Sequence, residues 1–181
     1  MGKENKSRYA LLGILSLAPM SGYDLKKMTS YSIGHFWNES YPQIYPMLKQ
    51  LESEGLTTSI VERQEGKPDR RVYTLTDTGW EALRLWLGEP FEYQVERNEL
   101  LLKLFFGGLV PSTISVEHVE RHRRLQLEAL HHYEQVEFEL QRDWPTHPQL
   151  PYWLMTLSAG KYISQAIVSW CEETLLKLEK L

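Results

Sequence analysis

Residues 41–56, YPQIYPMLKQLESEGL, decide how this chain is expected to fold. Apolar residues recur at positions 44, 47, 48 and 51, which is the one-sided spacing of a helix packed against a core. Pro42 and Pro46 are unusual in such a helix. Pro46 is tolerated among the first four helical positions, because their N–H groups have no intrahelical partner. The helix is therefore predicted to begin near Gln43 and to close at Gly55.

Two further helices are predicted ahead of this one. Residues 9–17 are rich in leucine and isoleucine and read as a helix stopped by Pro19. Ser21 is a good N-cap for a second helix that runs to about Ile33. The chain thus begins with three short helices in succession.

A β-hairpin and a return helix are predicted next. LTTSIVERQ (56–64) and RRVYTLT (70–76) are rich in β-branched and aromatic residues and flank a loop that contains Gly and Pro. Thr76 then caps a fourth helix that continues to about Leu87. Three helices, a two-stranded hairpin and a return helix make a winged helix-turn-helix, which we assign to residues 1–88.

The second half of the chain is predicted to be entirely helical. Gly88-Glu89-Pro90 punctuates the sequence and marks a domain boundary, so the second domain is assigned to residues 89–181. Helices are expected over 95–106, over 112–143 and from 152 to the end. The fold class is therefore mostly α with a small β-hairpin.

The last of these helices carries a stripe of apolar and small residues at spacings of three and four. An intramolecular three-helix bundle is one explanation. Three helices of unequal length would leave much of a long helix uncovered, however, so two chains wrapping their helices together is the simpler solution. The residues expected at this dimer interface are Leu157, Gly160, Ser164, Ile167, Cys171 and Leu178.

Composition narrows the class of protein. The 181 residues are 42% hydrophobic, which is too apolar for a disordered chain. The single Cys171 cannot form an internal disulfide and fits a reducing compartment, with the cytoplasm as the default. The opening residues resemble a signal peptide only superficially, because the apolar run is short, and no other segment predicts a membrane span. The net charge of −4 argues weakly against nucleic-acid binding, but the acidic excess lies in the second domain.

The helix at 41–56 has the features of a recognition helix. In a helix-turn-helix, the first residues of that helix meet the base edges and its later turns pack on the core. Its face opposite the apolar line would present an amide, a phenol and a cation, and the hairpin tip adds further cations. The residues expected to contact DNA are Tyr23, Ser40, Gln43, Tyr45, Lys49, Lys67, Arg70 and Arg71. The alternative is that they are solvated residues of a winged helix that binds another protein.

Aromatic residues gather in the sequence near the domain junction, and others in the helical half could face them. Together they could line an apolar cavity of the kind that small molecules favour. Aromatic residues at helical spacing are more often part of a core. The candidate ligand-binding residues are Trp80, Trp86, Phe91, Tyr93, Phe105 and Trp153.

Catalytic patterns are weak. His118 and His122 are one helical turn apart, as metal ligands would be, but Val119 replaces the glutamate of a zincin, and no third ligand has a convincing spacing. The sequence has no G-x-S-x-G motif, Walker loop or dinucleotide fingerprint. We expect no enzyme activity, no metal and no cofactor.

Three stretches, SGYDL (21–25), FWNESYPQIYPMLKQLESEGL (36–56) and VYTLTDTGWEAL (72–83), resemble the PadR family of bacterial transcriptional regulators. VERNELLLKLFFGGL (95–109) resembles the start of the longer C-terminal domain in the phenolic-acid-responsive branch of that family. The resemblance implies a homodimer made by the C-terminal helices, bound to inverted-repeat operator DNA, and usually repression relieved by a small molecule. The expected partners are therefore double-stranded operator DNA, a second copy of the chain and a small-molecule effector, with no membrane.

Overall fold

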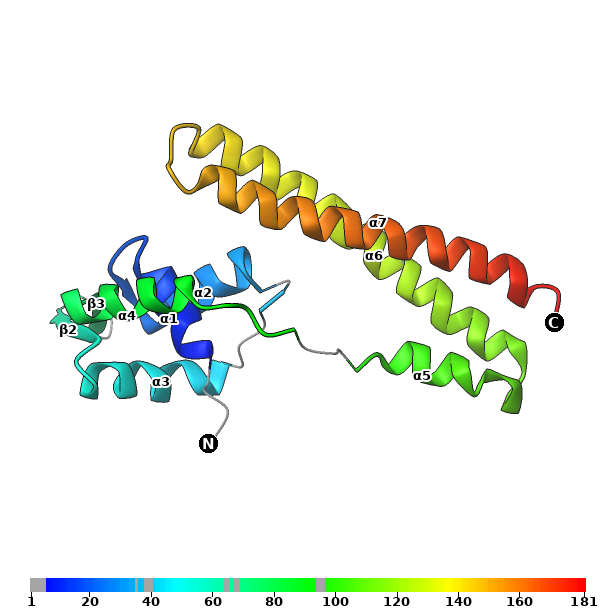
Figure 1. The fold of residues 1–181 in the computed structure, drawn as a ribbon, viewed down its shortest axis with the longest axis horizontal. Coiled ribbons are helices and arrows are strands. Elements are labelled where there is room, and N and C mark those ends of the chain that lie inside the picture. The colour runs from blue at the N-terminus through cyan, green and yellow to red at the C-terminus, as the bar shows by residue number, and fades with distance from the viewer. Residues whose placement is uncertain (1–5, 35, 38–40, 64–65, 67–68, 94–96) are drawn as a thin grey trace. The chain divides into compact units, whose positions relative to one another are not determined.

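The computed structural model describes residues 6–34, 36–37, 41–63, 66, 69–93 and 97–181. The chain divides into two compact units, Met1–Tyr93 and Gln94–Leu181, here called the N-terminal unit and the C-terminal unit (Figure 1). Each has its own buried core.

The N-terminal unit is a winged helix-turn-helix. Its elements in order are α1 (Ser7–Leu15), β1 (Met20–Ser21), α2 (Gly22–Ser32), α3 (Tyr41–Ser53), β2 (Thr57–Glu62), β3 (Arg70–Leu75) and α4 (Asp77–Gly88). The predicted hairpin is β2 and β3, which pair antiparallel. The two-residue β1 adds a third antiparallel strand, with Met20 opposite Tyr73 and Ser21 opposite Val72. Two residues are too few for a period-2 pattern, so the sequence did not predict this strand.

The predicted apolar line of α3 forms the centre of the N-terminal core. Ile44, Leu48 and Leu51 are buried, and the neighbouring helices contribute Leu12 and Leu25. At about 25 cal/mol for each Å² of apolar surface removed from water, burial of such side chains is the main stabilising term that holds α3 in place. The predicted fold class is confirmed.

The start of α3 differs from the prediction. The helix begins at Tyr41, so Pro46 is inside it and beyond its first four positions. Placing Pro46 among those four positions was therefore wrong. Because proline has no N–H, the carbonyl of residue 42 lacks its usual donor in the helix. The other end of α3 matches the prediction, since Gly55 has a φ of +73°, the left-handed conformation that ends helices.

Both predicted N-caps are present. The Ser21 hydroxyl accepts from the Asp24 N–H, and the Asp24 carboxylate accepts from the Ser21 N–H, which completes a capping box. The Thr76 hydroxyl accepts from the Gly79 N–H and donates to the Gly55 carbonyl at 2.7 Å. Thr76 thus joins the start of α4 to the turn that follows α3.

The C-terminal unit consists of α5 (Glu99–Phe105), a short 3-10 helix η1 (Gly107–Leu109), α6 (Ser112–Asp143) and α7 (Leu150–Leu178). The last two form a long antiparallel hairpin (Figure 1). The first helix starts later than predicted because Asn98 is its N-cap, with the Asn98 side chain accepting from the Leu101 N–H at 3.0 Å.

The stripe predicted for the dimer interface packs largely within one chain. Leu157, Ser164 and Cys171 are buried in the single chain, and Leu157 belongs to a cluster with Tyr133 and Val136 of α6. Assigning these three residues to a surface that meets a second chain was wrong. The two helices are 32 and 29 residues long, so α6 covers the stripe along most of α7.

The remaining members of the stripe have mixed environments. A Cβ atom at Gly160 would lie 3.0 Å from the Tyr133 ring, so the small residue allows close approach to α6 rather than to a second chain. Ile167 and Leu178 are half-buried, whereas Val168 is the buried residue of its turn. The packed face of α7 is therefore rotated slightly from the predicted one.

Candidate nucleic-acid interface

The outer face of α3 presents the predicted polar residues. Gln43, Tyr45 and Lys49 are exposed, and they alternate with the buried Ile44 and Leu48 on the opposite side of the helix. Amide and ammonium groups on the open face of a recognition helix are suited to adenine edges, guanine edges and phosphate. Their role in DNA binding stays a prediction.

The first turn of α2 lies beside this face. Tyr23 is 64% exposed there, whereas the neighbouring Gly22 is buried. A Cβ atom at Gly22 would lie 2.6 Å from Cε1 of Tyr45, so the Tyr45 ring rests on the glycine. Tyr45 therefore has a packing role and also an exposed edge.

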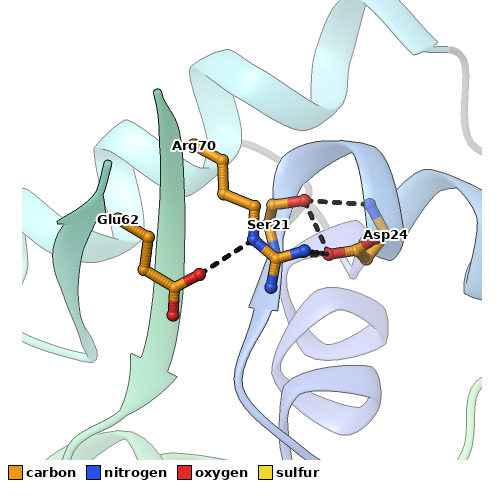
Figure 2. A network of polar contacts seen from close by, with 4 residues as sticks. All are labelled: Ser21, Asp24, Glu62 and Arg70. Carbon is orange, nitrogen blue, oxygen red and sulfur yellow. Dashed lines mark hydrogen bonds and ion pairs between the residues drawn. The ribbon is translucent and has the colours of Figure 1, made fainter. Parts of the chain in front are cut away.

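The arginine at the base of the wing is engaged by two carboxylates (Figure 2). Its Nε donates to Glu62 at 3.1 Å, and one terminal nitrogen of Arg70 lies 3.3 Å from Oδ2 of Asp24. The Ser21 hydroxyl also donates to that oxygen, at 2.7 Å. This hydrogen bond and, to a smaller extent, the Arg70 charge lower the pKa of Asp24. The guanidinium thus already has two anionic partners, and the expected contact of Arg70 with DNA stays a prediction.

The other predicted wing residues differ in what the structure describes. The Arg71 guanidinium is exposed and lies 3.8 Å from the Glu52 carboxylate. Ser40 and Lys67 lie outside the described residues. Of the predicted wing cations, only the positions of Arg70 and Arg71 can thus be related to the fold.

Sequence reasoning missed three cations near these elements. Lys26 and Lys27 are exposed on α2, and Arg63 is exposed directly after β2. The first helix of a helix-turn-helix crosses the DNA backbone, so basic residues on α2 are candidates for phosphate contact. The general geometry of the motif could have indicated the two lysines.

The predicted ligand-binding residues of the N-terminal unit fall into two groups. Trp80 and Trp86 pack against its core, and the Trp86 ring stacks on Tyr9 with centroids 4.6 Å apart. Phe91 and Tyr93 are both more than four-fifths exposed. The two tryptophans thus already have a structural role, whereas Phe91 and Tyr93 are exposed, and ligand binding by any of the four stays a prediction.

The two candidates in the C-terminal unit lie at opposite ends of it. Trp153 is in the first turn of α7 and stacks on His147 at 4.6 Å. Phe105 ends α5, whose neighbour Leu104 shares a surface hollow with Leu178 at the far end of α7. With a rise of 1.5 Å per residue, these ends are about 37 Å apart. Lining of one cavity by Phe105 and Trp153 of the same chain, as the sequence suggested, was therefore wrong.

The hollow beside α5 is mostly apolar. It is lined by Leu104, Gly107, Gly108, Val110, Ser112, Ser115, Leu178 and Leu181.

Within the described residues, no group of three His, Cys, Asp or Glu side chains could hold a metal ion. Among the helices in the described part of the chain, none is both long and apolar enough to cross a membrane.

The three-helix core, the hairpin wing and the polar outer face of α3 define a winged helix-turn-helix protein of the DNA-binding type. Residues 11–85 match the model of the transcriptional regulator PadR-like family, and residues 96–179 match the model described as virulence activator alpha C-term. Residues 11–85 thus belong to the PadR-like family of transcriptional regulators. The family consists of regulators and not of enzymes.

Individual relatives agree with this assignment. The chain is 39% identical over 101 residues to the negative transcriptional regulator PadR of Bacillus subtilis, a match that covers 55% of each protein. The matched segments span about half the length of the curated relatives. A crystal structure of Bacillus subtilis PadR in complex with operator DNA is 27% identical, with a TM-score of 0.83 over 96% of this chain and 99% of that chain. One of PadR in complex with p-coumaric acid is 25% identical, with a TM-score of 0.75 over 97% of this chain and 99% of that chain.

Proposed function

We propose that this regulator is a homodimeric repressor that binds an inverted-repeat operator through α3 and the wing, and that a small aromatic ligand releases it. The observation that carries the proposal is the outer face of α3, where Gln43 and Lys49 are exposed on a helix whose opposite side is fixed in the core. A structure similar over nearly its whole length is a complex with operator DNA. Repression follows the description of the relative from Bacillus subtilis as a negative regulator.

Binding is tested with the DNA upstream of the protein's own gene and with random DNA of the same length. Fluorescence anisotropy at fixed salt should show at least a thousandfold preference for the specific site. Equal affinity for both DNAs at every salt concentration would reject sequence-specific regulation and favour a winged helix that binds another protein.

The homodimer is supported by the surface of the C-terminal unit. Large apolar side chains stand exposed on both long helices of the single chain, and apolar surface of this kind marks interaction sites. Those on α6 and α7 include Leu125, Leu127, Phe138, Met155, Tyr162, Ile163 and Leu176. A recognition helix from each of two chains would enter successive major grooves about 34–36 Å apart. Sedimentation of the intact chain should show a dimer, and a monomer that still binds the operator would refute this part.

The aromatic ligand is supported by the similarity to the p-coumaric acid complex of PadR. The candidate contacts are Phe91, Tyr93, Trp80, Trp86, Phe105 and Trp153. Because Phe105 and Trp153 lie at opposite ends of the C-terminal unit, they must belong to different sites or to different chains. Titration with p-coumaric acid should quench tryptophan fluorescence and weaken operator binding by the same factor by which DNA weakens ligand binding. Quenching without any change in DNA affinity would refute the release step. We also propose a cytoplasmic location, which suits such a regulator.

A further inference from the structure

The four residues SGYD at 21–24 meet two elements of the N-terminal unit, the wing strand β3 and the recognition helix α3. Ser21 pairs with Val72 in the wing strand β3 through its backbone. Gly22 lies under the Tyr45 ring of the recognition helix, and Asp24 binds the wing arginine. The segment thus touches both of the elements that are proposed to meet DNA.

The contact with α3 depends on the absence of a side chain at position 22. A Cβ atom there would lie 2.6 Å from Cε1 and 3.1 Å from Cζ of Tyr45. The backbone does not require glycine, because the positive φ values among the described glycines occur only at Gly55 and Gly66. Glycine at position 22 is therefore explained by the ring that it accommodates. Since Tyr45 follows Gln43 by two residues, this contact holds the reading end of α3.

The contact with the wing uses Arg70 as a bridge (Figure 2). Arg70 and Glu62 are opposite each other in the β2–β3 register, where the two strands leave for the wing loop. The guanidinium binds Glu62 on one side and Asp24 on the other. The base of the wing is thereby tied to the same turn of α2 that supports Tyr45.

We propose that residues 21–24 form a positioning site that sets the distance between the recognition helix and the wing, and that Gly22 determines operator specificity through Tyr45 without itself touching a base. The proposal rests on the proposed function. Base readout needs donors and acceptors held to within about half an ångström, whereas phosphate contacts are less demanding and carry no sequence information. A shift of the Tyr45 ring should therefore reduce specific binding selectively.

Gly22→Ala tests the proposal. The added methyl group meets the side chain of Tyr45, a residue that is 40% exposed, so we expect the ring to move outward and the fold to be retained. Affinity for the operator should fall about tenfold, the loss expected for one base contact, while affinity for random DNA changes by less than about twofold. The dependence of random-DNA binding on salt should stay unchanged, because no phosphate contact is removed. Gly13→Ala is the matched control, since that residue also lies in a helix and a Cβ atom there meets nothing within 4 Å.

A double-variant cycle separates positioning from a general loss of stability. In a Tyr45→Ala background, Gly22→Ala should have no further effect on the ratio of operator to random-DNA affinity, because the obstructing ring is gone. The proposal is overturned if Gly22→Ala leaves that ratio at the wild-type value. It is also overturned if Gly22→Ala lowers the ratio as much in the Tyr45→Ala background as in the wild type.

A measurement without DNA keeps the proposal distinct from the proposed function. The NMR resonances of Gly22 should shift on Tyr45→Leu substitution, because an aromatic ring lies on this residue. If the wild type fails to prefer its operator but the Gly22 resonances move, the proposed function fails and the contact stands. If these resonances do not move, the positioning site is refuted whatever the DNA result.

Discussion

The substitution Gly79→Ala should destabilise the N-terminal unit strongly. Gly79 is in the first turn of α4, and a Cβ atom there would lie 2.0 Å from the carbonyl oxygen of Leu56. An ordinary carbon–oxygen contact is more than about 1 Å longer, and the obstacle is backbone rather than a flexible side chain. The Leu56 carbonyl also accepts from the Thr76 N–H at 3.1 Å, so moving it strains the junction between β3 and α4.

The magnitude follows from three opposing contributions. Overpacking of a tight site costs about 1–3 kcal/mol, and a weakened hydrogen bond costs about 1 kcal/mol more. Replacing glycine by alanine in a helix recovers at most about 1 kcal/mol. With the full gain counted, we expect a net loss of about 1–3 kcal/mol from a total that is typically about 5–15 kcal/mol.

Urea unfolding followed by tryptophan fluorescence measures this loss. Gly88→Ala is the control, because Gly88 ends the same helix and a Cβ atom there meets nothing within 4 Å. The control should lie within about 0.5 kcal/mol of the wild type or be slightly more stable. Equal unfolding midpoints for the two variants would show that the close approach of α4 to Leu56 is not real.

Three other predictions concern DNA binding by α3 and the wing, and the stability contributed by Asp24. Gln43→Ala should weaken operator binding by about 1–3 kcal/mol and leave random-DNA binding intact, which anisotropy can measure; equal losses would reject direct readout. Lys49→Ala should lower the slope of log affinity against log salt by about one, whereas Arg70→Ala should lower it less, because two carboxylates already offset the Arg70 charge. Because the folded pKa of Asp24 is lowered, its contribution to stability is present above its ordinary pKa near 4 and is lost as pH falls through the folded value. The stability difference between wild type and Asp24→Asn should therefore shrink in urea titrations below about pH 4, and a constant difference would contradict it.

Local signals in the sequence predicted most of the N-terminal unit. The apolar line of α3 identifies its buried face because only one side of a helix can meet a core, and Ser21 and Thr76 mark helix starts because their hydroxyls satisfy nearby N–H groups. The position of Pro46 inside α3 was not predictable in this way, since tertiary packing can hold a helix against the loss of one hydrogen bond.

Contacts between distant parts of the chain could not be predicted from the sequence. The ion pair between Arg70 and Asp24 joins a wing strand to a helix far away in the sequence, and no spacing in the sequence encodes that contact. The same holds for Gly22, because the need for glycine there comes from its contact with the Tyr45 ring, and only the folded structure creates that contact.

The sequence alone determined the order and kind of the elements other than β1 and η1, because helix periodicity, caps and turn residues are properties of neighbouring positions. It also determined that one stripe of α7 is buried. Only the tertiary structure decided that this stripe meets α6 of the same chain, because a periodic pattern specifies which side chains leave water and not which helix covers them. It likewise decided that Phe105 and Trp153 stand at opposite ends of the helical hairpin, since the direction in which α7 returns along α6 sets which ends meet.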